Sequence, residues 1–285
     1  MITRTRTTLW LLVAMLFASC GTVPKTSITA FPQGQPLTAV DNALYARVLA
    51  RAVAPNGAVS YQKLISDTDL TAYLREIARV QTDAFTSRSE LLSFWINTHN
   101  AYVLDMIRRA WPVRSIDDIP GFRNAKVILA GGLRYSLADI EHEILERQFR
   151  EPRAFFALSD GSRSSPNLQR VPYTEAKLNA ELDRRLKIFL ADSTKNYLDR
   201  RANTIYLSKI FETYSSDLAT AAGGTLTDFI RDFAPPRMVH WIARHRDVKL
   251  LYLRYDNTIN TNDIEPIHKP IYRPIPPRKH VGGIQ

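Results

Sequence analysis

The sequence predicts an α+β fold, in which a mostly helical single domain surrounds a small, mainly antiparallel sheet. Apolar residues recur at helical spacing through most of the segments between 41 and 245. Strand-like runs are few and short, the clearest being 204–208 and 248–256. The apolar content of 45% and charged content of 23% are ordinary for a globular protein with its own core. We expect about seven or eight helices in one domain over approximately 41–260.

Helix boundaries are well marked in the first part of this domain. Asp41 is placed to cap a helix that runs to about residue 54, and 68–80 has a second amphipathic pattern. Ser87 and Glu90 form a capping-box pattern, and Pro112 ends the helix that follows. That helix is apolar nearly all round, which predicts a course through the core.

The polar residues of this core helix are candidates for a special role. Asn97 and Asn100 are three residues apart and share one side of the helix with Ser93. Each amide can satisfy backbone groups of a loop, so a buried hydrogen-bond scaffold is the favoured interpretation. The alternative, compatible with it, is that both amides line a polar pocket. His99 projects among apolar side chains, namely Leu92, Val103 and Met106.

A hairpin and a helix with an anomalous charge are predicted next. Residues 126–136 alternate weakly around Gly131-Gly132, as in a β-hairpin. Ser136 and Asp139 resemble a second capping box, opening a helix that Pro152 ends. On a helical wheel Glu141 falls inside the apolar arc, with His142 at its edge. An unpaired buried carboxylate is very costly, so Glu141 requires a partner.

The remaining elements follow from shorter patterns. Residues 154–158 form an apolar run suited to a buried strand, and 159–172 form a loop rich in hydroxyls, Gly and Pro. The later segments are a helix over about 174–192, a strand at 204–208, a helix at 209–218, helices near 225–233 and 236–245, and a strand at 248–256. The proline-rich 261–285 is expected to be a tail or an extended strap.

The N-terminal segment has the three-part layout of a secretory signal peptide. Arg4 and Arg6 precede nine apolar residues and the small pair Ala18-Ser19, and Cys20 follows directly. The run is too short for a spanning helix, which needs about 20 apolar residues. Cys20 after small residues resembles a bacterial lipobox, which implies 1–19 as a signal peptide and lipidation of Cys20. The alternatives are an ordinary signal peptide cut nearby and an uncleaved anchor.

This arrangement implies a location and a set of partners. Residues 20–40, rich in Pro, Gly, Thr and Gln, have the composition of a flexible tether. The protein would be held on a membrane through lipid on Cys20, in the bacterial cell envelope facing the periplasm. The net charge of +10 is scattered along the chain rather than clustered. We therefore interpret the basic residues as solvated surface and expect no nucleic-acid partner.

Several segments together resemble the domain of unknown function 547. They are FWINTHNAYVLDMI, SLADIEHEILERQF, EPRAFFALSDGSRSSPNL, IYLSKIFETYSSDL and LRYDNTIN, in the order of that family and spanning roughly 90–260. The resemblance implies no established activity. It does imply matches at further positions, namely Asn97, Asn100, Glu141, His142, Ser208 and Tyr214.

The departures from the family pattern are informative. Members typically carry R-x-H-F-A-L followed by two cysteines, the second just before a proline. The corresponding positions here are Phe155 for the histidine, Asp160 for the first cysteine and Ser165 for the second. Thiol chemistry at those positions is therefore excluded. Tyrosine is usual at the position of His99, which argues against His99 as a required ligand.

Two chemistries are alternatives to a binding function. A serine hydrolase of peptide- or ester-type bonds could use Ser165 or Ser164 with His142 as base and Glu141 or Asp160 to orient it. No G-x-S-x-G elbow is present, however. A metal could be held by His142, Glu141 and Asp160, with His240 or His245 elsewhere. Those two are five residues apart, off the i, i+4 spacing of paired ligands, so we expect no metal and no other cofactor.

The function predicted from the sequence is therefore a lipid-anchored envelope protein, with a domain that acts as a binding or accessory module. Its ligand or protein partner is not specified by the sequence. Its pocket is expected between the Asn97 helix, the Glu141-His142 helix and the 159–166 loop, with Ser208 as a further candidate. The hydrolase based on Ser165 and His142 is the alternative.

Overall fold

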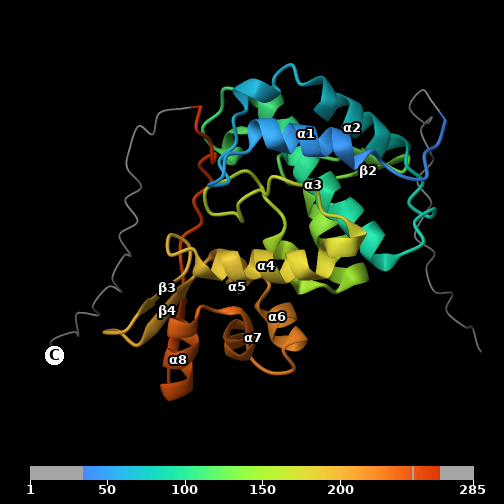
Figure 1. Ribbon diagram of the computed structural model, residues 1–285. Helices are drawn as coiled ribbons and strands as arrows, with labels where there is room; N and C mark the ends of the chain where they lie inside the picture. Colours follow the sequence, from blue (N-terminus) through green and yellow to red (C-terminus); the bar gives the residue numbers. More distant parts are fainter. Residues whose placement is uncertain (1–34, 246, 264–285) are drawn as a thin grey trace, which may run out of the picture.

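The computed structural model describes residues 35–245 and 247–263, and its architecture is built around one long helix (Figure 1). This helix, α3 (Arg88–Ala110), packs against α2 (Thr68–Arg79), which in turn pairs with α1 (Asn42–Ala52). The yellow helix α4 (Leu178–Ala191) crosses below, and the orange C-terminal helices lie beneath it (Figure 1). The predicted mostly helical α+β class is confirmed.

Side-chain caps begin the first helices as the sequence predicts. The Asp41 carboxylate accepts from the backbone N–H of Ala43, and Ser87 Oγ accepts from the N–H groups of Ser89 and Glu90. These bonds satisfy helix N–H groups that have no partner within the helix. Asp67 caps α2 in the same way, by accepting from Leu70.

Helix α3 is buried on nearly all sides between residues 92 and 105. Its burial encloses polar side chains together with apolar ones: Ser93, Asn97, Thr98, His99, Asn100 and Asp105. Buried polar groups generally need hydrogen-bond partners, and Asn97, His99 and Asn100 find theirs on segments packed against α3.

The helix that carries Glu141 is η3 (Asp139–Phe149), a π-helix. It opens with the reciprocal bonds of the predicted capping box, since Ser136 N–H donates to Asp139 and Asp139 N–H donates to Ser136 Oγ. It ends at Arg150, which has a left-handed φ of 44°. The wide π turn spaces buried residues four and five apart, and these are Ile140, Glu141, Ile144, Leu145 and Phe149.

The strand predicted at 154–158 is wrong. This segment belongs to η4 (Pro152–Phe156), a 3-10 helix with Pro152 at its start and Glu151 accepting from the N–H of Arg153. Its aromatic residues are buried, as the apolar run suggests, because Phe156 packs against Phe189 and Phe211. The run therefore identifies burial correctly, but no strand lies beside it to form a ladder.

The strands form two small sheets in place of the single predicted sheet. Strands β1 (Ile128–Ala130) and β2 (Leu133–Tyr135) make the predicted antiparallel hairpin around Gly131-Gly132. In the second sheet β3 (Tyr197–Asp199) pairs antiparallel with β4 (Thr204–Leu207), which pairs parallel with β5 (Lys249–Tyr252).

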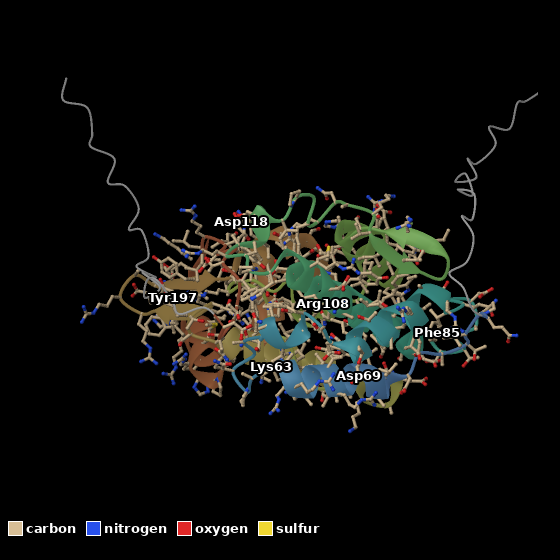
Figure 2. All side chains as sticks on the ribbon, turned by 90° about the horizontal axis from the view of Figure 1, so that it is seen from above. Lys63, Asp69, Phe85, Arg108, Asp118 and Tyr197 are labelled. Atoms are coloured by element: carbon tan, nitrogen blue, oxygen red, sulfur yellow. The ribbon has the colours of Figure 1, made fainter. Side chains whose placement is uncertain are left out.

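The remaining helices are short and lie mainly in the C-terminal half. The predicted helix 209–218 is divided at Tyr214 into α5 (Lys209–Thr213) and α6 (Ser215–Ala221). The other elements are η1 (Gln62–Leu64), η2 (Ile116–Asp118), η5 (Glu175–Lys177), α7 (Leu226–Phe233) and α8 (Pro236–Arg244). Seen from above, Tyr197 of β3 and Phe85 lie near opposite ends of an elongated molecule (Figure 2).

After β5, residues 254–263 run as an extended strap across the domain. The strap forms single bridges from Thr258 to Ser115, from Ile259 to Ser162 and from Thr261 to Val59. Asp263 then accepts from Ser60 Oγ and from the N–H of Gln62. The strap therefore joins segments that are distant in sequence on one side of the molecule.

Several predictions concern residues outside the described part. The signal peptide, Cys20 and most of the tether lie before residue 35, and 264–285 of the proposed tail lie after the strap. Among the described residues, none of the helices combines the length and apolar character needed to span a bilayer.

Two glycines provide a matched test of packing against α3. Gly161 has φ +79°, and an added Cβ would lie 2.3 Å from Ile107 Cδ1, whereas Gly223 has φ +64° with open space around it. We expect Gly161→Ala to lower the unfolding free energy by about 3 kcal/mol, because backbone strain adds to overpacking. Gly223→Ala should lower the unfolding free energy by only about 1 kcal/mol. Equal losses of unfolding free energy for the two variants, measured by urea denaturation, would contradict this packing.

Candidate ligand site

A cavity of about 390 Å³ opens between α3, η3, the 158–166 loop, α5 and the strap. Its polar lining consists of His99, Arg123, Asn124, Glu141, His142, Asp160, Ser165, Lys209, Thr213, Tyr214, Tyr255 and Asn257. Ala138, Phe155, Leu158, Pro166 and Ile210 complete it. The volume is within the range of small-molecule sites.

Glu141 has the partners that its burial requires. Its Oε1 lies 3.0 Å from His99 Nε2, and its Oε2 lies 3.5 Å from an Arg123 guanidinium nitrogen. The side chain is 9% exposed and that of His99 only 1%. The sequence predicts apolar neighbours for His99 on its own helix, and the structure adds Glu141 of η3 as a polar partner.

The orientation of the His99 ring depends on the neighbouring Asn100. The Asn100 Nδ2 donates to the carbonyl of Ala157, and its Oδ1 accepts from the N–H of Ser159. These two bonds fix which end of the amide is oxygen. The same Oδ1 lies 3.3 Å from His99 Nδ1. One amide thus ties α3 to the loop and also sets the role of the histidine.

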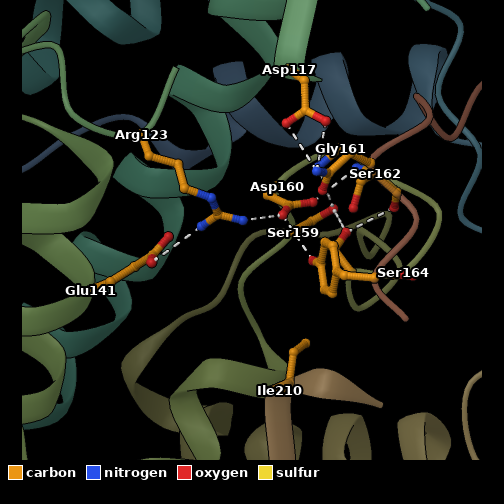
Figure 3. Close-up of polar contacts among 12 residues, drawn as sticks. Asp117, Arg123, Glu141, Ser159, Asp160, Gly161, Ser162, Ser164 and Ile210 are labelled. Atoms are coloured by element: carbon orange, nitrogen blue, oxygen red, sulfur yellow. Dashed lines mark hydrogen bonds and ion pairs between the residues drawn. The ribbon is translucent and has the colours of Figure 1, made fainter. Parts of the chain in front are cut away.

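Arg123 bridges the two acidic residues of the cavity (Figure 3). It donates to Asp160 Oδ2 at 2.6 Å, in addition to its contact with Glu141. Burial lowers the pKa of the Arg123 guanidinium, but the charges of Asp160 and Glu141 outweigh burial and raise it overall. Arg123 therefore remains a cation between two carboxylates.

The hydrogen-bonding capacity of Asp160 is taken up by several donors. Besides Arg123, Tyr255 Oη donates to its Oδ2 at 2.8 Å and the N–H of Ser162 donates to its Oδ1 at 2.9 Å. Burial and the adjacent Asp160 charge raise the pKa of Tyr255 well above its usual value, so this phenol stays protonated. The strap thereby contributes one wall of the site.

The apolar side of the cavity is an aromatic stack. The rings of Phe155 and Tyr214 lie 3.5 Å apart and nearly parallel. Ile210 points toward the polar cluster from below in Figure 3. Burial and the charge of Glu141 raise the pKa of Tyr214, which therefore retains its phenolic proton.

The serine and histidine proposed for hydrolysis have other partners. The buried Ser165 Oγ donates to the carbonyls of Ser162 and Pro166, and lies 3.4 Å from Ser159 Oγ. Ser164 Oγ accepts from the N–H of Asp256 at 2.7 Å. His142 is half-exposed and its Nδ1 contacts Glu146 Oε2 at 2.7 Å. Within the described ranges, no hydrogen bond joins a serine hydroxyl to a histidine.

The asparagine pair acts as a scaffold behind the cavity. Asn97 binds both backbone groups of Tyr173, donating to its carbonyl and accepting from its N–H. Neither Asn97 nor Asn100 lines the cavity. Ser208 does not line it either and instead caps α5 by accepting from the N–H of Ile210. These predicted pocket residues thus position the site without facing its interior.

A buried lysine supports the same loop from behind. Lys195 donates to the carbonyl of Ser165 at 2.7 Å and to Asn167 Oδ1 at 2.9 Å. Burial lowers the pKa of this ammonium group. In the part of the chain that the structure describes, no group of three or more histidine, cysteine, aspartate or glutamate side chains is placed to hold a metal ion.

The sequence interpretation missed Arg123 and Tyr255 as site residues. Arg123 lies in an irregular turn between η2 and β1, and Tyr255 lies beyond the last strand. Arg123 has no periodic pattern around it, and Tyr255 falls within the strand predicted at 248–256, whereas the observed strand ends at Tyr252. The burial of Glu141 was the available signal, because a buried carboxylate calls for a cation.

One family model matches the central part of the chain. The family model described as "Protein of unknown function, DUF547" matches residues 83–190. The predicted resemblance is confirmed over this stretch, which contains His99, Arg123, Glu141 and Asp160. No curated protein and no solved structure matches the chain.

The scaffold role of Asn100 can be tested through stability. Asn100→Leu keeps a similar volume but leaves the Ser159 N–H and His99 Nδ1 without this partner, and leaves the Ala157 carbonyl with only a 3.5 Å bond from Tyr173 Oη. We expect a loss of about 3 kcal/mol in unfolding free energy. Asn124→Leu, at an exposed position on the cavity rim, should change stability by only about 0.5 kcal/mol or less. Similar denaturation midpoints for the two variants would rule out the scaffold.

Proposed function

We propose that this domain is a binding module for a small ligand that combines an acidic oxygen group, such as a carboxylate, with an apolar ring. The observation that carries the proposal is the balance of free donors and acceptors in the cavity. Both oxygens of Asp160 already accept hydrogen bonds, and Glu141 is engaged by His99 and Arg123. The protein's acceptors are thus largely occupied.

Donors remain available at the same place. Arg123 contacts Asp160 at 2.6 Å with one nitrogen and Glu141 at 3.5 Å with another, which leaves further guanidinium N–H groups without a partner in the described part of the chain. Its side chain lines the cavity and is 44% exposed. The phenol of Tyr214 and the amide of Asn124 line the cavity without a hydrogen bond to any described residue. Donors aimed at one space favour a ligand that supplies acceptor oxygens, and a guanidinium is well suited to carboxylate.

The apolar wall supports a ring on the other end of the ligand. Phe155, Tyr214 and Ile210 lie along one side of the cavity. Sites for small molecules commonly combine an apolar surface with a few convergent polar groups. An aromatic ring could contact this side, while its carboxylate faced Arg123.

The positions that differ from the family pattern support binding over thiol chemistry. Phe155, Asp160 and Ser165, which replace the family's histidine and two cysteines, all line this cavity. The cavity therefore forms in this chain without thiols at these positions. Ser165 does not supply a substitute nucleophile in the observed arrangement, because its hydroxyl donates to backbone carbonyls and His142 contacts Glu146. These contacts weigh against the alternative serine hydrolase.

The location of the module is a separate part of the proposal. Cys20 follows an apolar run and two small residues, and it is the chain's single cysteine. Lipid on Cys20 would hold the domain at a membrane of the cell envelope through residues 20–40. This part of the proposal rests on sequence alone and is independent of the ligand.

Ligand class can be tested with three probes of similar shape: benzoate, benzamide and benzylamine. We expect saturation-transfer NMR to detect benzoate binding and much weaker signals for the neutral and cationic probes, because the free side-chain groups are donors. Ile210→Trp should fill the cavity and weaken benzoate binding by about tenfold or more. Ile188→Trp, on the exposed face of α4, is the matched control. Preference for benzylamine, or equal binding by both variants, would contradict the proposal.

Lipid attachment predicts a clear effect of Cys20→Ser. The wild-type chain expressed in a bacterial host should incorporate radiolabelled palmitate and sediment with membranes, whereas the variant should not incorporate label. Because the sequence contains one cysteine, label in the variant could not come from another thiol. Unlabelled wild-type protein in a host that labels a known lipoprotein would refute lipidation.

A further inference from the structure

We propose that His99 and Glu141 hold a single proton between them and that this proton determines whether the cavity accepts an acidic ligand. The ligand part of this inference rests on the proposed function. The proton part rests only on hydrogen-bond geometry within the protein. The matching family model describes a protein of unknown function and assigns no role to either residue.

The first step is the protonation of His99 Nδ1. Asn100 is held with its oxygen toward the ring, because its Nδ2 donates to Ala157 and its Oδ1 accepts from Ser159. An amide oxygen can only accept. The ring nitrogen facing it, Nδ1 at 3.3 Å, must therefore carry a hydrogen.

The second step concerns the other ring nitrogen. Nε2 lies 3.0 Å from Glu141 Oε1. If the histidine were neutral and the glutamate ionised, two lone pairs would face each other in a buried site. A proton must lie between them, either as imidazolium with carboxylate or as neutral imidazole with carboxylic acid. Both forms have the same total charge of zero.

A second proton on the pair is disfavoured by Arg123. It would occupy Glu141 Oε2, which forms an ion pair with an Arg123 guanidinium nitrogen at 3.5 Å. Protonation there would remove the negative charge that pairs with this cation. The observed geometry consequently fits one proton.

The other charged and titratable groups around the pair are paired with opposite charges or neutral, so the net charge of the cavity changes with this proton. Arg123 and Asp160 neutralise each other, and Lys209 on α5 is paired with Glu212. On η3 itself, His142 contacts Glu146. Tyr214 and Tyr255 complete the surroundings, and their raised pKa values keep both phenols neutral.

Loss of the shared proton would therefore change the cavity from neutral to negative. The new charge would appear on Glu141, beside the space where an acidic ligand would meet Arg123. The ionised Glu141 and the carboxylate of the ligand would repel each other strongly in this partly buried site. The pair is thus a specificity determinant: acidic ligands bind while the proton is present and are rejected after it has left.

The proton can be observed without any ligand. In ¹⁵N-labelled protein, we expect the imidazole spectrum of His99 to show a hydrogen on Nδ1 and, as the pH is raised, a single step that reports loss of the shared proton. Glu141→Gln should remove this step, since the Gln amide can donate to Nε2 and leave the ring neutral. Glu146→Gln, on the same helix, should change His142 and leave His99 unaltered.

The wild-type spectrum is decisive even if a variant fails to fold. An unprotonated Nδ1 in wild-type His99, or a step that persists in folded Glu141→Gln, would overturn the inference. Benzoate then tests the second part. Its affinity for wild-type protein should fall about tenfold per pH unit above the step, while its affinity for Glu141→Gln should stay constant.

These outcomes separate the two proposals. Absence of benzoate binding at every pH would refute the proposed ligand class but would leave the protonation of His99 established by the spectrum. Benzoate binding that is unchanged across the titration step would preserve the binding function and refute the control by the shared proton.

Discussion

The burial of one carboxylate, Glu141, is the constraint on which the site depends. A charge in this position requires compensation, and the protein provides it from both sides, with His99 on α3 and Arg123 on the loop before β1. Arg123 in turn donates a hydrogen bond to Asp160, which also accepts one from Tyr255 of the strap. A chain of compensating contacts thus extends from the core helix to the C-terminal strap. The cavity lies along this chain, so its polar lining follows from the requirement to satisfy a buried charge.

Elements with local sequence signals could be predicted well. The caps at Asp41 and Ser87, the hairpin at Gly131-Gly132 and the Ser136-Asp139 box all depend on groups within a few residues of each other. The run at 154–158 shows the limit of such signals, because apolar content predicts burial without specifying strand or 3-10 helix. The parallel pairing of β4 with β5 is similarly nonlocal.

The site was predictable in part for the same reason. Glu141 was identified because its burial conflicts with its charge, and the loop 159–166 because of its composition. The partners could not be inferred, since Arg123 and Tyr255 lie in irregular segments and meet Asp160 only through the tertiary fold. The contact between Glu141 and His99 could not be predicted either, because it joins two separate helices, η3 and α3, whose packing is set by the tertiary fold.

The strap also has a consequence for how the protein acquires its structure. It is among the last described segments to be synthesised, yet it bridges to Val59, Ser115 and Ser162 and supplies Tyr255 to the cavity. Contacts of such long sequence separation form late and slow folding, because a long loop must close first. On the ribosome, α1 to α4 would emerge with Asp160 still lacking its phenol partner. The cavity is complete only once Tyr255 and Asn257 are in place, so a chain truncated before residue 254 would lack two of its lining residues.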